Sequence, residues 1–319
     1  MKYLVTGAAG FIGSSIVDAL LKDKDNEVVG VDCFLDYYPR DMKLKNLEQA
    51  KVNNKFKFIE CNLLTKNLVD LLLGVDVVFH QAAQAGVRAS WGKDFSTYVD
   101  NNILATQCLL EAARSKPVKP TLKKIVFASS SSIYGNAISY PTLETTTPQP
   151  ISPYGVSKLA AEHLMSLYSK EFGVPTVSLR YFTVYGPRQR PDMAFHKFIK
   201  AGLTGGTINI FGNGEQTRDF TYIGDIVDAN LLAAKRTCNH LVYNIGGGSR
   251  IKLKEVITTI EKILGMSLSA VFENQQAGDV EHTGADTGNA LTDLEYTPKT
   301  TLEDGLKAEV AWLKDNLNT

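Results

Sequence analysis

The sequence predicts an α/β protein in which a doubly wound parallel sheet is joined to a smaller second domain. Short segments rich in Val, Ile and Phe recur through the first half of the chain, and longer segments with helical periodicity lie between them. Segments that are apolar on both faces are typical of strands in a buried parallel sheet. Their alternation with helices favours the doubly wound arrangement.

Six segments are expected to form the strands of this sheet. In chain order they are 2–7 (KYLVTG), 26–32 (NEVVGVD), 56–62 (FKFIECN), 75–83 (VDVVFHQAA), 123–130 (KKIVFASS) and 175–182 (PTVSLRYF). Two of the intervening segments, 11–23 (FIGSSIVDALLKD) and 101–115 (NNILATQCLLEAARS), have the pattern of helices.

The rhythm changes after Phe182. Segments such as 186–192 (GPRQRPD) and 211–219 (FGNGEQTRD) are rich in Gly and charge, and strands become fewer. We therefore expect a first domain over residues 1–180, to which about 219–243 also contribute, and a smaller C-terminal α/β domain over 181–319. The chain has no repeats and no low-complexity linker, so the domains should be closely joined.

Composition excludes several classes of partner. Lys plus Arg and Asp plus Glu both number 34, and this zero net charge argues against nucleic acid or an anionic membrane. No apolar run approaches the roughly 18 residues that span a bilayer. We also expect no secretory signal, because the first residues, MKYLVTGAAGFIG, lack a long apolar stretch and have the pattern of a strand and turn. The scattered cysteines and histidines predict reduced cytoplasmic thiols and no metal site; the cysteines are Cys33, Cys61, Cys108 and Cys238.

A glycine loop, VTGAAGFIG (5–13), follows the first strand and opens the first helix. Glycines in this context permit a tight turn and a close backbone approach to a pyrophosphate, which the helix N-terminus also attracts. The loop predicts a Rossmann-like dinucleotide site, with contacts from Gly7, Gly10, Phe11, Ile12 and Gly13.

An acid at the end of the second strand bears on which dinucleotide is bound. Asp32 lies nineteen residues after Gly13, where a carboxylate accepts hydrogen bonds from the adenosine ribose and repels a 2′-phosphate. We therefore expect NAD as the cofactor. Lys43 and Lys45 could assist a phosphate, which leaves NADP as the alternative, and Asp32 could also be a simple turn residue.

The segment SPYGVSK (152–158) places Tyr154 and Lys158 four positions apart, on one face of a helix. Alone, such a pair is common and fits a surface helix start. Together with the glycine loop and the serine run FASSSSIYG (127–135), its spacing resembles the extended short-chain dehydrogenase/reductase family over essentially the whole chain. Within that family the chain is most similar to nucleotide-sugar epimerases, especially UDP-glucuronate 4-epimerases, through GVRASWG (86–92) and RYFTVYGPRQRPDMAFHKFI (180–199).

The resemblance implies catalytic roles for three residues. Tyr154 would remove the proton from the sugar 4-hydroxyl while C4 gives hydride to NAD⁺, and Ser130 would hydrogen-bond the reacting oxygen. Lys158 would hold the nicotinamide ribose. Because a free phenol has a pKa near 10, we expect the Lys158 ammonium and the nicotinamide charge to lower the pKa of Tyr154. The alternative for the serine run is a polar loop at strand ends.

The resemblance also implies binding residues. Further cofactor contacts fall on Lys43, Asn62, Leu63, Ala82, Ala83 and Asn102, where Asn102 either approaches the cofactor or buttresses the strand before it. Substrate contacts fall on Arg88, Ser131, Ser132, Thr183, Arg190, Phe211, Arg218 and Asp279. Arg218 would bind the UDP diphosphate, since a guanidinium matches phosphate geometry, or would instead pair with Asp219.

Two positions depart from the family pattern. Asn62 stands where an Asp is usual, which leaves an adenine contact possible through the amide. Gln276 stands where the family often has an Arg, so one diphosphate arginine is missing and the role of Gln276 is open.

The serine run also discriminates between reactions. Related dehydratases commonly have an Asp-Glu pair in this segment, and UDP-glucuronate decarboxylases commonly have a Glu two residues before its Tyr. Here Ser131 and Ser132 precede Ile133 and Tyr134, which argues against elimination and decarboxylation and leaves C4 epimerisation through a 4-keto intermediate.

The choice of sugar depends on four residues. Many UDP-galactose 4-epimerases have Asn at the position of Thr183. Ser131, Ser132, Thr183 and Arg190 could instead converge on a carboxylate, which favours UDP-glucuronate as the substrate and UDP-galacturonate as the product. The alternatives are a UDP-glucose/UDP-galactose 4-epimerase and, in a different class, a non-catalytic NAD-binding regulator. Apolar residues on several sides of the helices near 101–114 and 154–172 predict a homodimer.

Overall fold

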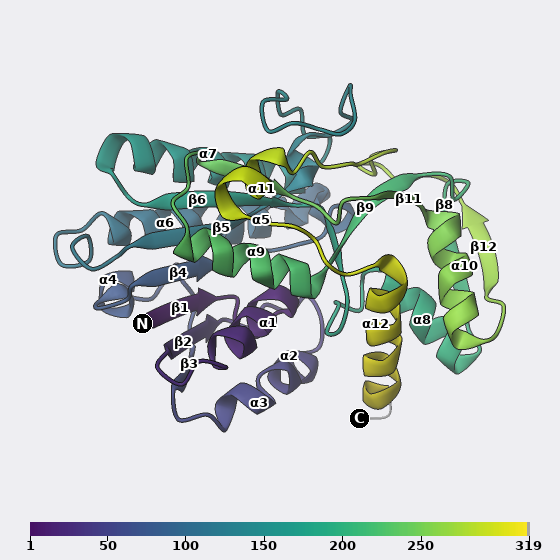
Figure 1. Cartoon of the computed structure of the whole chain (residues 1–319), viewed down its shortest axis with the longest axis horizontal. Helices are drawn as coiled ribbons and strands as arrows, with labels where there is room; N and C mark the ends of the chain where they lie inside the picture. Colours follow the sequence, from purple (N-terminus) through teal and green to yellow (C-terminus); the bar gives the residue numbers. More distant parts are fainter. Residues whose placement is uncertain (318–319) are drawn as a thin grey trace.

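The computed structural model describes residues 1–317 and is built around a large parallel sheet (Figure 1). Its strands run in the order β10-β6-β5-β4-β1-β2-β3, and every neighbouring pair is parallel. They are β1 (Lys2–Thr6), β2 (Glu27–Asp32), β3 (Phe56–Glu60), β4 (Val77–His80), β5 (Lys124–Ser130), β6 (Thr176–Tyr181) and β10 (Val242–Ile245). The predicted doubly wound fold is confirmed, and all six predicted strands are present.

Helices cover both faces of the sheet. They are α1 (Phe11–Leu20), α2 (Arg40–Asn46), α3 (Glu48–Lys51), α4 (Leu68–Leu72), α5 (Phe95–Tyr98), α6 (Ala105–Ala113), α7 (Pro153–Phe172), α9 (Ile223–Lys235) and α11 (Gly288–Leu294). Short helical turns occupy η1 (Arg88–Ser90), η2 (Gly92–Asp94), η3 (Val99–Leu104, a π-helical turn) and η4 (Ser131–Ile133).

The strand period of two divides the core into two layers. In β1, Tyr3 and Val5 pack on one face with α1 and α9, whereas Leu4 packs on the other face with α4, α6 and α7. The same alternation recurs in β4, where Val77 and Phe79 point away from Val78. This explains why the strands read as continuous apolar runs, since both faces of each strand are buried.

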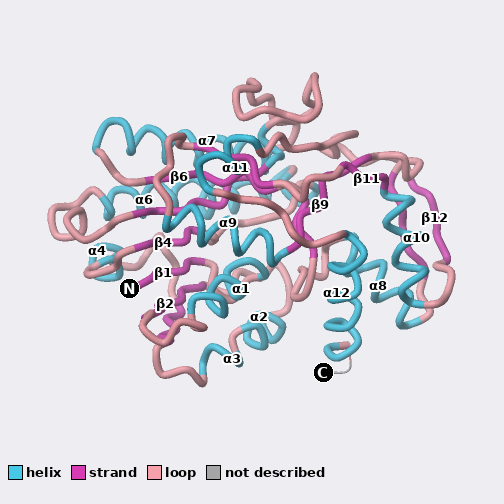
Figure 2. Tube along the Cα trace, viewed as in Figure 1, coloured by secondary structure: helices cyan, strands magenta, loops and turns pink. Residues whose placement is uncertain are grey.

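A second part of the molecule lies beyond the carboxyl ends of the strands of the large sheet (Figure 1). It contains a three-stranded sheet, β7 (Thr183–Tyr185), β9 (Thr217–Tyr222) and β11 (Arg250–Lys252), and a parallel pair, β8 (Thr207–Phe211) with β12 (Ser269–Glu273). Its helices are α8 (Ala194–Thr204), α10 (Leu253–Leu264) and α12 (Leu302–Asn316). They form one hydrophobic core, to which α8 contributes Phe195, α10 contributes Val256 and α12 contributes Leu306. Figure 2 shows these three helices grouped beside β9 and β11, away from β1 and β2.

The chain passes between the two parts more than once. After β9 it returns to the large sheet through α9 and β10, and after β12 it returns again through α11, which packs on the same face as α9. The domain boundary predicted near residue 180 stays a prediction. Within residues 1–317, no helix combines the length and the apolar character that crossing a bilayer requires.

Glu309 fastens α12 to the segment after β7. One of its carboxylate oxygens accepts a hydrogen bond from the Gly186 backbone N–H at 2.9 Å, and the other has no hydrogen-bond partner within residues 1–317. Burial raises the pKa of Glu309 from 4.5 to about 8. The folded protein therefore holds a proton that the unfolded chain releases between these two pH values.

This raised pKa predicts a pH-dependent stability. Stability from Glu309 is complete below pH 4.5 and is lost as pH rises toward 8, in total up to about 5 kcal/mol. Urea unfolding at pH 5, 6.5 and 8.5 should show this loss in the wild type and a much smaller loss in Glu309→Gln. Glu303→Gln, on the exposed side of the same helix, is the control. A Glu309→Gln variant with the wild-type pH dependence would contradict the prediction.

Candidate active site

A cavity opens at the carboxyl ends of the parallel strands, where the chain turns outward in opposite directions from β1 and β4. Ligands of doubly wound folds bind at such a switch point. The cavity is lined by every predicted cofactor contact except Asn102, namely Gly7, Gly10, Phe11, Ile12, Gly13, Asp32, Lys43, Asn62, Leu63, Ala82, Ala83, Tyr154 and Lys158. Arg190 lines it as well.

The glycine loop has no room for side chains. A Cβ on Gly13 would lie 2.1 Å from the Gly7 carbonyl oxygen, and one on Gly7 would lie 2.8 Å from the Ala82 backbone nitrogen. Gly7 also has φ +67°, in the left-handed region that favours glycine. Gly10 is the N-cap of α1 and provides no side-chain cap, so N–H groups of the first turn are free for a ligand.

Asp32 ends β2 at the rim of this cavity. Its two oxygens accept hydrogen bonds from the backbone N–H groups of Ala9 at 3.1 Å and Phe34 at 2.9 Å. Burial raises the pKa of Asp32, while these hydrogen bonds and the Lys43 charge act in the opposite direction. Lys43 itself donates to the Leu35 carbonyl at 2.5 Å and lies over the Tyr38 ring.

Asn102 lies behind the cavity. Its amide donates to the Gln84 carbonyl at 3.0 Å and to the Ser157 hydroxyl at 2.8 Å, and its oxygen accepts from the Gln84 N–H at 2.7 Å. It therefore joins the segment after β4 to α7, while the neighbouring Asn101 lines the cavity.

Tyr154 and Lys158 occupy the first two turns of α7. The helix starts here because the Ser152 hydroxyl accepts a hydrogen bond from the Gly155 N–H and Pro153 occupies the first helical position. Burial raises the pKa of Tyr154, and a hydrogen bond with Ser130 and the charge of Arg190 lower it in part. The expectation that Lys158 lowers the pKa of Tyr154 is wrong for this structure: burial raises this pKa, and the cation that opposes the rise is Arg190.

Lys158 is buried, with its ammonium 4.5 Å from the centre of the Phe127 ring. Burial lowers the pKa of Lys158 to about 7, and the carboxylate of Glu162 acts in the opposite direction. Glu162 lies one helical turn further along α7, four residues after Lys158.

Glu162 belongs to a buried polar network beneath the site. Its oxygens accept hydrogen bonds from the Ser129 hydroxyl at 2.6 Å and from Arg180 Nε and Nη2 at 3.0 and 2.7 Å. Arg180 also donates to the Tyr134 hydroxyl, which donates to Asn244. The network ties α7 to β5, β6 and β10.

The predicted sugar-binding residues lie at neighbouring strand ends. Ser131 and Ser132 follow β5, and Thr183 begins β7 directly after β6. Since Ser130 pairs with Tyr181, these residues leave the sheet side by side, and all three are half-buried.

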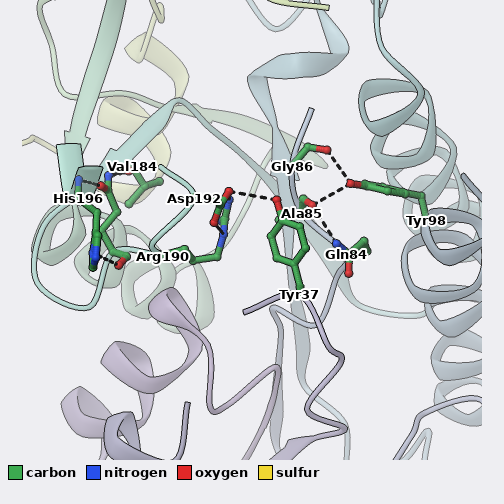
Figure 3. Close-up of polar contacts among 10 residues, drawn as sticks. Tyr37, Gln84, Ala85, Gly86, Tyr98, Val184, Arg190, Asp192 and His196 are labelled. Carbon is green, nitrogen blue, oxygen red and sulfur yellow. Dashed lines mark hydrogen bonds and ion pairs between the residues drawn. The ribbon is translucent and has the colours of Figure 1, made fainter. Parts of the chain in front are cut away.

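Arg190 approaches the cavity from the segment after β7. Its Nε and Nη2 donate to the two oxygens of Asp192 at 2.9 and 3.0 Å, and the Tyr37 hydroxyl donates to Asp192 at 3.1 Å (Figure 3). The pKa of Arg190 is raised by the Asp192 carboxylate despite burial. The guanidinium is therefore charged and already paired.

A second cavity holds the remaining predicted substrate contacts. Phe211, Arg218 and Asp279 line it. Arg88 reaches the same place, with Nη2 2.6 Å from Asp279 and its guanidinium 3.9 Å from the centre of the Phe211 ring. Arg218 donates to the carbonyls of Thr217, Val280 and Glu281, and burial lowers its pKa.

Asp219, the alternative partner for Arg218, faces elsewhere. Its oxygens accept hydrogen bonds from the N–H groups of Gly247 and Ala285. Gln276 donates to the Asn274 carbonyl at 3.3 Å.

Sequence reasoning missed Tyr37, Tyr98, Glu162 and Asp192. Tyr98 stacks edge-on against Tyr154 with ring centroids 6.2 Å apart, and its hydroxyl donates to the carbonyls of Ala85 and Gly86. Only Glu162 left a local signal, because it continues the four-residue spacing of Tyr154 and Lys158. Tyr37 and Asp192 are separated by 155 residues, and no local pattern connects them.

Comparisons with known proteins agree over the full chain. Residues 3–246 match the model of the NAD dependent epimerase/dehydratase family. The chain is 48% identical to the Bacillus subtilis protein described as an uncharacterized UDP-glucose epimerase, YtcB, over 98% of each chain. It is 37% identical to a UDP-glucuronate 4-epimerase of Thermodesulfobacterium geofontis, covering 99% of this chain and 97% of the relative.

A solved structure is similar to the chain over nearly the whole length of both proteins. The UDP-glucuronic acid 4-epimerase from Bacillus cereus, crystallised with UDP-glucuronic acid and NAD, superposes with a TM-score of 0.95. The two chains are 46% identical, over 99% of this chain and 100% of the other.

Proposed function

The chain belongs to the NAD dependent epimerase/dehydratase family, and we propose that it interconverts UDP-glucuronate and UDP-galacturonate by inversion at C4. The observation that carries this function is the whole-chain match to the Bacillus cereus enzyme with its substrate and NAD. The protein is an NAD-dependent UDP-sugar 4-epimerase.

The residues present fit NAD. A Cβ atom on Gly7 or Gly13 would collide with the backbone, so the loop leaves room for a close approach by a ligand. The Asp32 carboxylate lines the same cavity and would accept hydrogen bonds from the adenosine ribose. Gly10 and the α1 N-terminus would hold the pyrophosphate, and Lys158 would hold the nicotinamide ribose. When bound, NAD supplies a reversible hydride acceptor for C4 of the sugar.

Tyr154 is the proposed general base for the 4-hydroxyl. The Tyr154 phenolate would accept the 4-hydroxyl proton, and the resulting phenol would later return that proton to the 4-oxygen when the 4-keto sugar is reduced on its opposite face. Burial alone would make Tyr154 too weak an acid to be ready at neutral pH, and the Ser130 hydroxyl and Arg190 charge offset part of this penalty. Ser130 would hold the reacting oxygen.

Two arginines would bind the UDP diphosphate. Arg218 reaches the second cavity from β9, and Arg88 reaches it from η1. Because Gln276 replaces the arginine often found near the chain end, Arg88 takes the role of the second cation. Its stacking on Phe211 fixes the guanidinium, and Asp279 orients it.

The sugar carboxylate would bind between Ser131, Ser132, Thr183 and Arg190. Nε and one N–H of Nη2 of Arg190 are used by Asp192, so the remaining guanidinium N–H groups are available to the ligand. The serine and threonine hydroxyls add donors without adding charge. A carboxylate held in this way is kept from leaving as CO₂ from the β-keto acid.

We also infer a homodimer formed through α7 and the η3–α6 segment. These elements expose four large apolar side chains, and burying them against a second copy would remove apolar surface from water. They are Leu104, Val156, Leu167 and Phe172, which are 44, 46, 50 and 40% exposed. Light scattering at micromolar concentration should give a dimer mass; a monomer mass would contradict the inference.

A cytoplasmic location is inferred from the four free cysteines, which suit a reducing compartment. A disulfide between them in protein trapped directly from cells would contradict it.

The function is tested by comparing turnover of UDP-glucuronate, UDP-glucose and UDP-N-acetylglucosamine by the purified protein. We expect UDP-glucuronate to give UDP-galacturonate with the highest kcat/KM, and Tyr154→Phe to lose about 10² to 10⁴ in kcat while still binding the substrate. Preference for UDP-glucose would favour the second candidate, a UDP-glucose 4-epimerase, which the YtcB description supports.

Arg190→Ala should separate selection from chemistry. If the guanidinium binds the carboxylate, the variant should lose roughly 1.5–3 kcal/mol of binding for UDP-glucuronate and much less for UDP-glucose. Dissociation constants from calorimetry measure both. The double variant Arg190→Ala/Asp192→Asn controls for the charge left on Asp192. Equal losses for the two sugars would assign Arg190 a structural or UDP-binding role.

A further inference from the structure

A strap of seven residues, 186–192, leaves β7 and reaches α8. Near its middle, the strap is held by hydrogen bonds of Gln189. The Gln189 amide donates to the Val184 carbonyl at 3.2 Å, its side-chain oxygen accepts from the His196 N–H at 2.9 Å, and its carbonyl meets His196 Nδ1 at 3.1 Å. These hydrogen bonds hold the middle of the strap to β7 on one side and to α8 on the other.

One end of the strap is pinned to α1, the helix that the glycine loop opens. Arg188 Nη2 lies 2.7 Å from the Asp18 carboxylate, and these side chains are 17 and 27% exposed. Arg188 has φ +70°, a conformation that residues other than glycine rarely adopt. Such an outlier persists only where its surroundings hold it, and the ion pair with Asp18 does so.

The other end is pinned to the segment after β2. The Tyr37 hydroxyl donates to Asp192, the last residue of the strap. Tyr37 lies tightly against the segment after β4, because a Cβ on Gly86 would stand 2.2 Å from its hydroxyl oxygen. Figure 3 shows Tyr37 between Asp192 on one side and Ala85 and Gly86 on the other, with Tyr98 holding these two carbonyls.

Topology places this strap across the cofactor cavity. In the sheet order, β2 lies on one side of the β1–β4 switch point, and β6, which leads into β7, lies on the other side. A contact between Tyr37 and Asp192 must therefore bridge the crevice that opens between β1 and β4. Tyr37 and Arg190, from the two sides of this bridge, both line the cavity.

We propose that Tyr37 and Asp18 are positioning residues that act through the strap to keep NAD in its cavity. The reaction returns the hydride to the sugar within the same active site. If the cofactor dissociated between the two hydride transfers, the 4-keto sugar would remain unreduced. The strap closes the cavity between two contacts, the Asp18–Arg188 ion pair and the Tyr37–Asp192 hydrogen bond. NAD leaves only when both contacts open. The inference depends on NAD binding and is independent of which sugar is the substrate.

The test measures how fast bound NAD exchanges with radiolabelled NAD⁺ added to the NAD-loaded protein. Tyr37→Phe should exchange about tenfold faster, because it removes a hydrogen bond to a charged group. Asp18→Asn should exchange about threefold faster, the smaller effect of a partly exposed ion pair. In the double variant, the acceleration of NAD exchange should be at least the product of the two single-variant accelerations, because both contacts hold the same strap.

Two comparisons separate the effect of the strap on NAD exchange from other effects of the substitutions. Tyr37 lines the cavity and could touch NAD itself, whereas Asp18 is not among the lining residues, so faster exchange in Asp18→Asn reports the strap alone. Tyr243→Phe removes a tyrosine–aspartate hydrogen bond of 2.7 Å elsewhere, to Asp293 of α11, and should exchange like the wild type.

Wild-type exchange rates in Asp18→Asn and in the double variant would overturn the proposal, as would equal acceleration by Tyr243→Phe. Since Asp18→Asn changes one partly exposed side chain, it tests the strap even if Tyr37→Phe fails to fold. Exchange is measured without sugar. A protein that shows the expected exchange rates but does not convert UDP-glucuronate would support the strap and contradict the proposed function.

Discussion

The buried ion pair between Glu162 and Arg180 sets where α7, the helix that carries Tyr154 and Lys158, meets the sheet. The paired side chains are 3 and 6% exposed, and both carboxylate oxygens are hydrogen-bonded. Removing either partner would leave an unpaired charge in the core, at a cost of about 3–5 kcal/mol. Because Glu162 lies one turn after Lys158, and Ser129 precedes Ser130, the same pair holds both α7 and the start of the serine run in place.

The three arginines that we propose to bind the charged substrate are already paired in the structure. Arg190 is held by Asp192, Arg88 by Asp279, and Arg218 by backbone carbonyls. Each guanidinium is thus oriented before the substrate arrives, so less side-chain freedom is lost on binding.

The features that the sequence predicts are those in which neighbours along the chain make the contact. The strands, the glycine loop, Asp32 and the Tyr154–Lys158 spacing all follow from local periodicity or from turn geometry, and they lie where expected. Asn102 illustrates the limit, because its motif allowed either of two roles and only the packing against Gln84 and Ser157 places its amide. The contacts between Tyr37 and Asp192 and between Asp18 and Arg188 join segments more than 150 residues apart, and they depend on how the sheet brings strand ends together.

The repeated passage of the chain between its two parts limits how such a protein can be rebuilt. The elements of the second part come from three separate stretches, β7 to β9, β11 to β12, and α12, while α9, β10 and α11 return to the large sheet between them. A single genetic crossover cannot exchange this second part for another without also cutting the sheet. New substrate preferences in this architecture should therefore arise by individual replacements, such as those at Thr183 or within the serine run. A chimera would need five coordinated junctions, two around each internal stretch and one before α12.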